Sequence, residues 1–320
     1  MPISVYRVKK VQTPPQIQVG SFKIAFLTDG LWLNDGGCMF GVVPRELWKK
    51  DHPPDDQNRI RLNLTCPLIM RGREAVLVDT GIGNRLRDVE RKIFGHQDGW
   101  LPDGLKALGM EAGDITHVVL SHLHFDHCGG VVRRRGEGGF VAAFPRARYF
   151  VQRGEIEVAG DSTNERMRAA YRHAAECLGP LAGLIEPLRG DTTIIPGVQA
   201  LVTGGHTVDH QVVLVSDGPD AFVHLADIVP TRSHMKGPWN QAYDLDPLTT
   251  MARKAEYLAR AAAHRWWISF AHDDQVFTAH VRKDGGKLGL SDMVGVPREY
   301  QSRQPIGGEM SGSSAAGKSL

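Results

Sequence analysis

The 320-residue sequence predicts an α/β protein in which two β-sheets pack against each other and helices cover their outer faces. Strand-like segments outnumber helical ones, because nine apolar runs are rich in β-branched and aromatic residues and several end at Gly or Asp, as strands do. These runs also come in neighbouring groups along the chain. Grouped strands favour two packed sheets over a strictly alternating βαβ fold.

The expected elements follow from hydrophobic periodicity and from capping residues. The expected strands occupy residues 22–30, 64–70, 74–81, 116–122, 147–152, 198–205, 210–218, 221–227 and 265–273. The expected helices occupy residues 99–109, 163–179 and 247–264, the last with Pro and Thr near its start. The tail from residue 304 is rich in Gly and Ser, which predicts disorder. We therefore expect one folded domain over residues 1–282 and a C-terminal extension over residues 283–320, disordered toward its end.

Composition narrows the classes of protein to consider. With 42% hydrophobic and 23% charged residues, the chain has enough apolar side chains for one large core or two modest ones. A formal net charge of +2 is too small to indicate a nucleic-acid partner. The sequence shows neither the apolar stretch of a signal peptide nor a run of about 20 apolar residues, so we expect a cytoplasmic protein without a membrane partner. Its four cysteines form no C-x-x-C pair, which argues against a disulfide framework.

The stretch "SHLHFDHCGG" (121–130) carries the main chemical signal. It places His122, His124, Asp126 and His127 directly after an apolar run. Buried groups of this kind cost several kcal/mol unless something compensates them, and a metal ion is the obvious compensator. In an extended segment, residues two apart point the same way, so the first three should project together and His127 should face the other side. Four such donors suit two adjacent ions better than one tetrahedral ion.

Three further metal-capable residues stand at the ends of apolar runs. His206 follows "ALVTGG", Asp227 ends "AFVHLAD" and His272 ends "WWISFAH". For any one of them alone, a capping or core role is favoured over metal binding. Together with the histidine run they make a set of seven ligands for two ions.

These residues resemble the motif set of the metallo-β-lactamase superfamily, in which H-x-H-x-D-H is followed by a histidine, an aspartate and a histidine in this order. The resemblance implies a four-layer αββα sandwich, with residues 1–282 as the hydrolase domain and a dinuclear centre in the cleft between the sheets. It implies one ion held by His122, His124 and His206, the other held by Asp126, His127 and His272, and Asp227 as the bridge. Asp79 in "VLVDTG" matches the buried aspartate that orients a ligand histidine in this family.

Departures from several branches of the superfamily favour small-molecule hydrolysis. Secreted β-lactamases often have a cysteine where this chain has Asp227, and di-iron members have an acidic residue where it has His124. The 45 positions from Asp227 to His272 leave no room for the extra domain of nucleic-acid-processing members. The stretch "LNDGGCMFGVVPRELW" (33–48) is similar to the quorum-quenching N-acyl homoserine lactonase branch.

This branch implies that a hydroxide bridging two divalent ions attacks the lactone carbonyl. Zinc is the expected metal, although a mixed set of His and carboxylate ligands also accepts manganese, iron or cobalt. Asp227, which would touch both ions, is expected to carry the proton to the leaving group. A phosphotriesterase or aryl esterase with the same site is the alternative, and a non-catalytic sensor is a third reading that a bridging carboxylate argues against. The expected partner is a small-molecule lactone or ester, and a homodimer is left open.

The substrate side of the site is less well specified. Met39, Phe40 and Trp239 are expected to contact the acyl chain, with ordinary core packing as the alternative. The lactonases of this branch place a tyrosine three residues after the bridging aspartate, where this chain has Pro230. We expect His234 to take over that role as a catalytic residue that orients the substrate, because an imidazole both donates hydrogen bonds and relays protons at neutral pH. Thr231 and Tyr243 are the alternatives.

Overall fold

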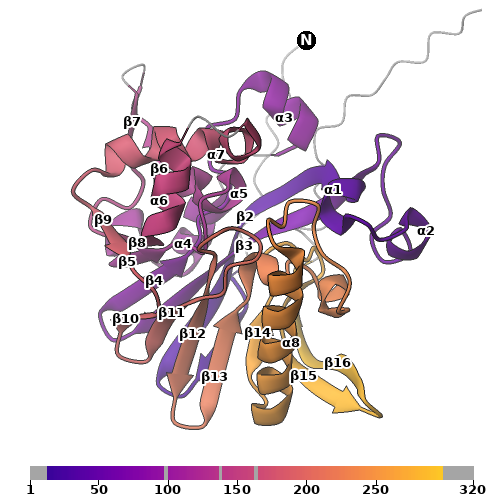
Figure 1. Ribbon diagram of the computed structural model, residues 1–320. Helices are drawn as coiled ribbons and strands as arrows, with labels where there is room; N and C mark the ends of the chain where they lie inside the picture. The colour runs from indigo at the N-terminus through magenta and orange to yellow at the C-terminus, as the bar shows by residue number, and fades with distance from the viewer. Residues whose placement is uncertain (1–12, 97–99, 137–138, 162–164, 298–320) are drawn as a thin grey trace, which may run out of the picture.

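The computed structural model of the chain describes residues 13–96, 100–136, 139–161 and 165–297 (Figure 1). Two seven-stranded sheets pack face to face, and helices lie on their outer faces (Figure 1). This arrangement confirms the predicted αββα class. Within the described ranges, no helix has the length and apolar composition needed to span a bilayer.

The first sheet holds the N-terminal half of the chain and is mixed. Its strand order is β1-β2-β3-β4-β5-β8-β9. The pairs from β1 to β4 are antiparallel, and β4, β5, β8 and β9 run parallel to one another. The bounds are β1 (Gln16–Val19), β2 (Phe22–Asp35), β3 (Arg59–Arg71), β4 (Glu74–Val78), β5 (His117–Val119), β8 (Arg148–Gln152) and β9 (Ile185–Leu188).

The second sheet holds the C-terminal half, in the order β10-β11-β12-β13-β14-β15-β16, with one parallel pair, β13 and β14. The bounds are β10 (Thr192–Ile195), β11 (Val198–Val202), β12 (Gln211–Asp217), β13 (Asp220–His224), β14 (Trp267–Ser269), β15 (Val276–Asp284) and β16 (Lys287–Gly295). The division expected after residue 282 falls inside β15. The described part of the expected extension therefore includes the edge strand β16, while the tail from residue 304 lies outside the described residues.

Helices and one short hairpin complete the fold. The α-helices are α1 (Gly36–Phe40), α2 (Arg45–Trp48), α3 (Asp88–Phe94), α4 (Trp100–Ala107), α5 (Phe125–Cys128), α6 (Arg153–Gly160), α7 (Glu165–Leu178) and α8 (Pro247–His264). Single 3₁₀ turns are η1 (Ala112–Asp114), η2 (Gly129–Val131), η3 (Gly179–Leu181), η4 (Ala226–Ile228) and η5 (Arg232–Met235). The hairpin pairs β6 (Val132–Arg134) with β7 (Phe140–Ala142).

Three apolar layers hold the sandwich together. Between the sheets, the Phe26 ring stacks on Phe277 at 5.7 Å and lies 5.9 Å from Phe222. Helices α4, α6 and α7 pack on the outer face of the first sheet, and α8 packs on the outer face of the second through Tyr257 and Leu258. Close packing of this kind fixes the strand ends that carry the functional residues.

The three predicted helices correspond to α4, α7 and α8. Helix α8 has the predicted bounds, because the Asp246 carboxylate accepts hydrogen bonds from Leu248 N and Thr249 N at its start. Strand β5 is shorter than predicted and ends at Val119, before the histidine run. The run is therefore not an extended segment throughout: Asp126 and His127 lie on the helical turn α5.

Strands β2 and β3 are longer than predicted and pair as far as Asp35 and Arg59. They carry α1 and α2 away from the body of the sandwich (Figure 1). An apolar cluster fills the base of this projection, with Phe40 stacked on Trp48 at 5.2 Å and Trp239 packed edge-on to Phe40. This projection forms one side of the cavity described below.

Candidate metal centre

The structure brings the seven expected ligands together at one edge of the sandwich. Four of them follow strand β5 of the first sheet. His122 and His124 lie in the loop after β5, and Asp126 and His127 lie on α5. The other three follow strands of the second sheet. They are His206 after β11, Asp227 in η4 after β13, and His272 after β14.

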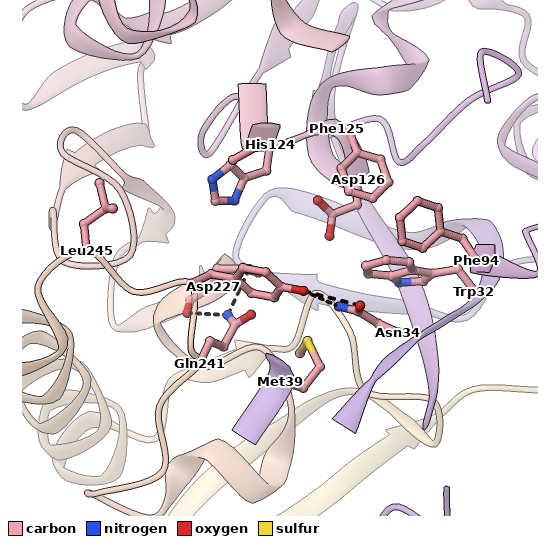
Figure 2. Close-up of a pocket in the computed structure, with 12 residues that line it drawn as sticks. Trp32, Asn34, Met39, Phe94, His124, Phe125, Asp126, Asp227, Gln241 and Leu245 are labelled. Atoms are coloured by element: carbon pink, nitrogen blue, oxygen red, sulfur yellow. Dashed lines mark hydrogen bonds between the residues drawn. The ribbon is translucent and has the colours of Figure 1, made fainter. Parts of the chain in front are cut away.

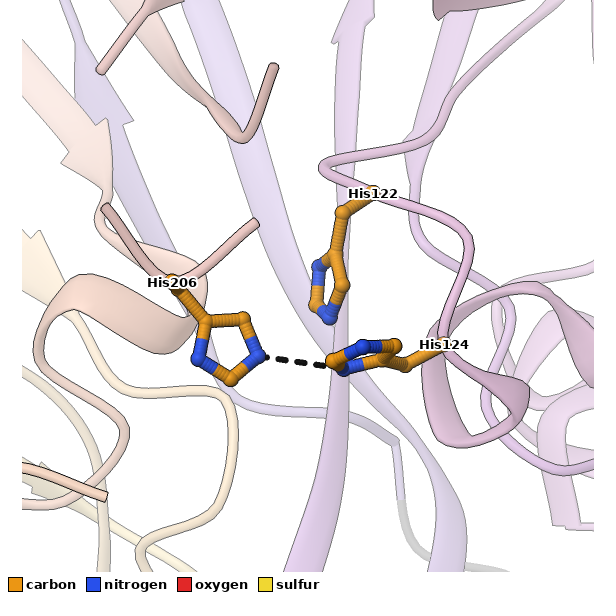
Figure 3. A group of neighbouring side chains, drawn as sticks. All are labelled: His122, His124 and His206. Carbon is orange, nitrogen blue, oxygen red and sulfur yellow. Dashed lines mark hydrogen bonds between the residues drawn. The ribbon is translucent and has the colours of Figure 1, made fainter. Parts of the chain in front are cut away.

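The histidines fall into two groups, each compact enough for one ion. In the first, the ligand atoms of His122, His124 and His206 all lie within 4.8 Å of one another (Figure 3). Nε2 of His206 is 3.1 Å from Nδ1 of His124. In the second, the ligand atoms of Asp126, His127 and His272 meet the same limit, and the two histidine Nε2 atoms are 3.1 Å apart.

Asp227 stands between the two groups with one oxygen toward each. Its Oδ2 lies 3.2 Å from Nε2 of His206, and its Oδ1 lies 3.1 Å from Nε2 of His272. A carboxylate so placed can share its two oxygens between two ions. Gln241 fixes its orientation, because the Gln241 amide donates to Asp227 Oδ2 over 3.0 Å.

Asp79 holds the histidine run from behind. Its Oδ2 lies 2.9 Å from Nδ1 of His127, and its two oxygens accept hydrogen bonds from the backbone N–H and the hydroxyl of Ser121. A carboxylate on Nδ1 orients the ring and leaves Nε2 to face the centre. Gly129 and Gly130 let α5 come close enough, because a Cβ at either position would collide with the carbonyl oxygen of Ile82 or Thr80.

Two further ring partners were not predicted from the sequence. Nδ1 of His206 lies 2.8 Å from the Asp244 carboxylate, and Nδ1 of His272 donates to the Asn63 carbonyl over 3.0 Å. Asp244 stands in a loop without periodicity, and a backbone carbonyl leaves no trace in residue type. Neither partner therefore has a local sequence signal.

The electrostatics of the centre favour bound cations. Burial, together with the positive charge that neighbouring histidines can carry, holds the pKa of His122 and His124 well below the ordinary histidine value, so both are neutral ligands. Burial also opposes protonation of His127, but the carboxylates of Asp227 and Asp126 outweigh it and raise the pKa of His127 well above 6.5. The second group thus attracts positive charge.

Two buried polar atoms in the centre indicate whether metal ions would fit there. Among the described residues, Nε2 of His122 and Oδ1 of Asp227 have no hydrogen-bond partner. A buried polar atom without a partner is costly, and both atoms point into the groups described above. A divalent cation would satisfy them, and the mixed nitrogen and oxygen donor set suits zinc, manganese, iron or cobalt.

A cavity of about 390 Å³ opens onto the centre. Its residues are Trp32, Asn34, Met39, Phe94, His124, Phe125, Asp126, Ala170, Asp227, Gln241, Tyr243 and Leu245. Three aromatic rings form one side (Figure 2): Trp32 packs edge-on to Phe125, and Phe94 lies 5.1 Å from Phe125. Met39 lines the cavity as the sequence analysis expected.

Neutral polar groups also line the cavity. The Tyr243 hydroxyl is 3.3 Å from the side-chain nitrogen of Asn34, which comes from β2. Gln241 and Asn34 were not predicted from the sequence, because isolated amides in loops and strands carry no pattern. From the sequence, Tyr243 was expected only as an alternative to His234.

The structure places His234 elsewhere, contrary to the substrate-facing role expected for it. Its Nδ1 is 2.8 Å from the Thr231 hydroxyl, and its Nε2 is 2.8 Å from the Met39 carbonyl oxygen, so both ring nitrogens are engaged. Burial lowers the pKa of His234 to about 3, which keeps the ring neutral at pH 7. Phe40 and Trp239 also lie behind the cavity lining, where Phe40 stacks on His234.

Comparison with known proteins agrees with this geometry. A family model described as the metallo-beta-lactamase superfamily matches residues 65–272, which is more than half of the chain. An N-acyl homoserine lactonase of Bacillus sp is 30% identical over 165 residues, covering 48% of this chain and 58% of that protein. A probable metallo-hydrolase of Mycobacterium tuberculosis is 30% identical over 204 residues, covering 56% of this chain and 62% of that protein. The chain thus spans about 60% of the length of these relatives.

Solved structures share the fold over most of the chain. A probable metal-dependent hydrolase from Staphylococcus aureus superposes with a TM-score of 0.78 at 26% identity, covering 88% of this chain and 99% of that one. AidC, a dizinc quorum-quenching lactonase in complex with a product, superposes with a TM-score of 0.72 at 19% identity, covering 88% and 98%. The sequence match, the shared fold and the clustered ligands lead to one conclusion: the chain belongs to the metallo-beta-lactamase superfamily.

Proposed function

We propose that this protein is a metal-dependent hydrolase, and specifically a lactonase that opens the ring of N-acyl homoserine lactones. The observation that carries the proposal is the pairing of two ligand groups around Asp227 with an adjoining cavity of about 390 Å³ that is lined by aromatic rings and neutral polar groups. A small ester with an apolar acyl chain matches both kinds of lining residue. The similarity to Bacillus N-acyl homoserine lactonases, at 28–30% identity, supports the same substrate class.

Seven residues would hold two divalent ions, with zinc as the proposed metal. They are His122, His124 and His206 for one ion, Asp126, His127 and His272 for the other, and Asp227 for both. The chemistry that two such ions supply when bound is activation of a water nucleophile and polarisation of the ester carbonyl.

Asp227 is the proposed proton carrier. In the overall reaction, the water oxygen bonds to the lactone carbonyl carbon and the bond from that carbon to the ring oxygen breaks. The proton released by the water ends on the former ring oxygen. Asp227 stands between the two ligand groups and also lines the cavity, so its carboxylate is well placed to move that proton. Gln241 keeps the Asp227 carboxylate oriented.

Tyr243 is the proposed donor to the substrate. Burial raises the pKa of Tyr243 well above 10, so the hydroxyl keeps its proton at neutral pH. Asn34 holds this hydroxyl at the cavity, where it would donate to the carbonyl oxygen or to the leaving oxygen. Trp32 and Phe125, which also line the cavity, would pack against the acyl chain and exclude water.

Kinetics on three substrates test this proposal. We expect the metal-replete protein to hydrolyse N-hexanoyl homoserine lactone with a higher kcat/KM than paraoxon or p-nitrophenyl acetate, and the product to gain the mass of one water. The matched variant Asp227→Asn should lose this activity. A preference for paraoxon or for the aryl ester would instead favour a phosphotriesterase or aryl esterase. Lactone binding without turnover would favour a non-catalytic sensor.

A further inference from the structure

Glu155 is a buried carboxylate that lies outside the cavity and outside both ligand groups. It stands on α6 with only 1% of its surface exposed. Its Oε2 accepts hydrogen bonds from Leu123 N over 3.0 Å and from the Tyr171 hydroxyl over 2.8 Å, and its Oε1 faces Asp209 N at 3.4 Å. The three partners come from three different segments of the chain, so one carboxylate connects all of them to α6.

Each partner of Glu155 leads to a histidine of the first group. Leu123 stands between His122 and His124 in the loop after β5, so its backbone fixes the path of both. The Tyr171 ring packs edge-on against His124, with 5.2 Å between ring centroids. The contact with Tyr171 therefore sets the orientation of the His124 ring as well.

Asp209 connects the same helix to the loop that carries His206. It follows His206 by three residues, and its carboxylate accepts a hydrogen bond from Gly154 N over 3.0 Å, next to the contact of its own N–H with Glu155. The start of α6 thus holds this loop at two points. The first group has no carboxylate of its own besides the shared Asp227, so its geometry depends on supports of this kind.

The second group depends on other supports. Asp79 orients His127 and the Asn63 carbonyl orients His272, and neither touches α6. In these three contacts the Glu155 side chain accepts from N–H or O–H groups. Asp79 contacts His127 directly and reaches His122 only through Ser121, whereas the contacts of Glu155 lead only to the first group.

We propose that Glu155 is a positioning residue that determines the metal affinity of the His122, His124 and His206 group without affecting the second group. This inference rests on the dinuclear centre proposed above. Removing an outer hydrogen-bonding partner of a metal site typically costs 10–100-fold in metal affinity. Glu155→Gln keeps the size of the side chain and removes its charge, so it should weaken the first group by about that factor.

Variants that keep only one of the two ligand groups intact isolate the effect of Glu155 on each group. His272→Ala leaves the first group intact, and His206→Ala leaves the second intact. Zinc affinity would be measured by competition with a chromophoric chelator on purified full-length protein. Glu155→Gln should lower zinc affinity about 10–100-fold in the His272→Ala background and leave it unchanged in the His206→Ala background. Asp79→Asn, the matched control, should lower zinc affinity in the His206→Ala background, where Glu155→Gln has no effect.

Tyr171→Phe provides a milder variant, because it removes one hydrogen bond to Glu155 and keeps the ring beside His124. It should lower zinc affinity of the first group in the same direction, with an unchanged far-ultraviolet circular dichroism spectrum of the metal-free protein. Equal loss of affinity in both backgrounds, or no loss in either, would overturn the role of Glu155. Fewer than two zinc ions on the otherwise unmodified protein would instead contradict the dinuclear centre itself.

Discussion

His234 and Tyr243 lie nine positions apart in one connection, and their surroundings give them different capacities. His234 has both ring nitrogens hydrogen bonded within the protein and a pKa lowered to about 3 by burial. Tyr243 lines the cavity together with Asp227 and has its hydroxyl next to Asn34. Residue type alone favoured the His234 imidazole as the group that contacts the substrate. Burial and hydrogen-bond partners favour the Tyr243 hydroxyl for that role.

The first prediction follows from this difference. Tyr243→Phe should lower kcat/KM for the lactone by about 10–100-fold, because one hydrogen bond to the developing negative charge is worth about 1.4–2.7 kcal/mol. Steady-state kinetics at equal metal content measure this loss. His234→Ala is the control and should lower kcat/KM less than Tyr243→Phe does. The opposite order would return the role to His234.

Elements with a strong local pattern were predictable, and elements that depend on tertiary packing were not. Helix α8 has the predicted bounds because Asp246 and Pro247 specify its start. Strand β16 was not predicted, because its side chains are largely exposed or half-buried and show little alternation. Strand β5 stops at Val119 because the chain then turns toward α5, a change that an apolar run cannot signal.

Helix α8 also holds the connection that supplies much of the site. The Lys254 ammonium, which is buried, donates to the Trp239 carbonyl over 2.7 Å and to the Asn240 side chain over 2.8 Å. Gln241 and Tyr243 follow directly in the same connection. Burial lowers the pKa of Lys254 to about 8, against the opposing effect of the Asp244 carboxylate.

The second prediction concerns pH and stability. Between about pH 8 and the ordinary lysine pKa near 10.4, the folded protein has released the Lys254 proton while the unfolded chain still holds it. The free energy of unfolding contributed by this group should therefore rise with pH across that window. Urea unfolding of the unmodified protein and of Lys254→Met would measure it, as a difference that shifts in favour of the unmodified protein from about pH 8 to about pH 10. A constant or shrinking difference would contradict the lowered pKa of Lys254 in the folded protein.

At the scale of the whole molecule, the two sheets matter because each supplies part of the centre. The ligand residues were predictable because histidines and carboxylates that follow buried strands are costly without a compensating partner, and their spacing matches a known motif. Asp244, Gln241 and Glu155 were not, because each acquires its role only when the sandwich brings distant segments together. The sequence thus predicts the metal ligands better than the groups that orient them.

The central claim is that both sheets together hold two metal ions, bridged by Asp227, and the most direct test is elemental analysis of the protein after metal-replete expression and exhaustive dialysis. The ligand atoms form two groups, one on each side of the Asp227 carboxylate. The predicted result is two divalent ions per chain for the unmodified protein and a clear loss for Asp227→Ala, with His234→Ala unchanged. One ion or none in the unmodified protein would contradict the dinuclear centre and the mechanism built on it.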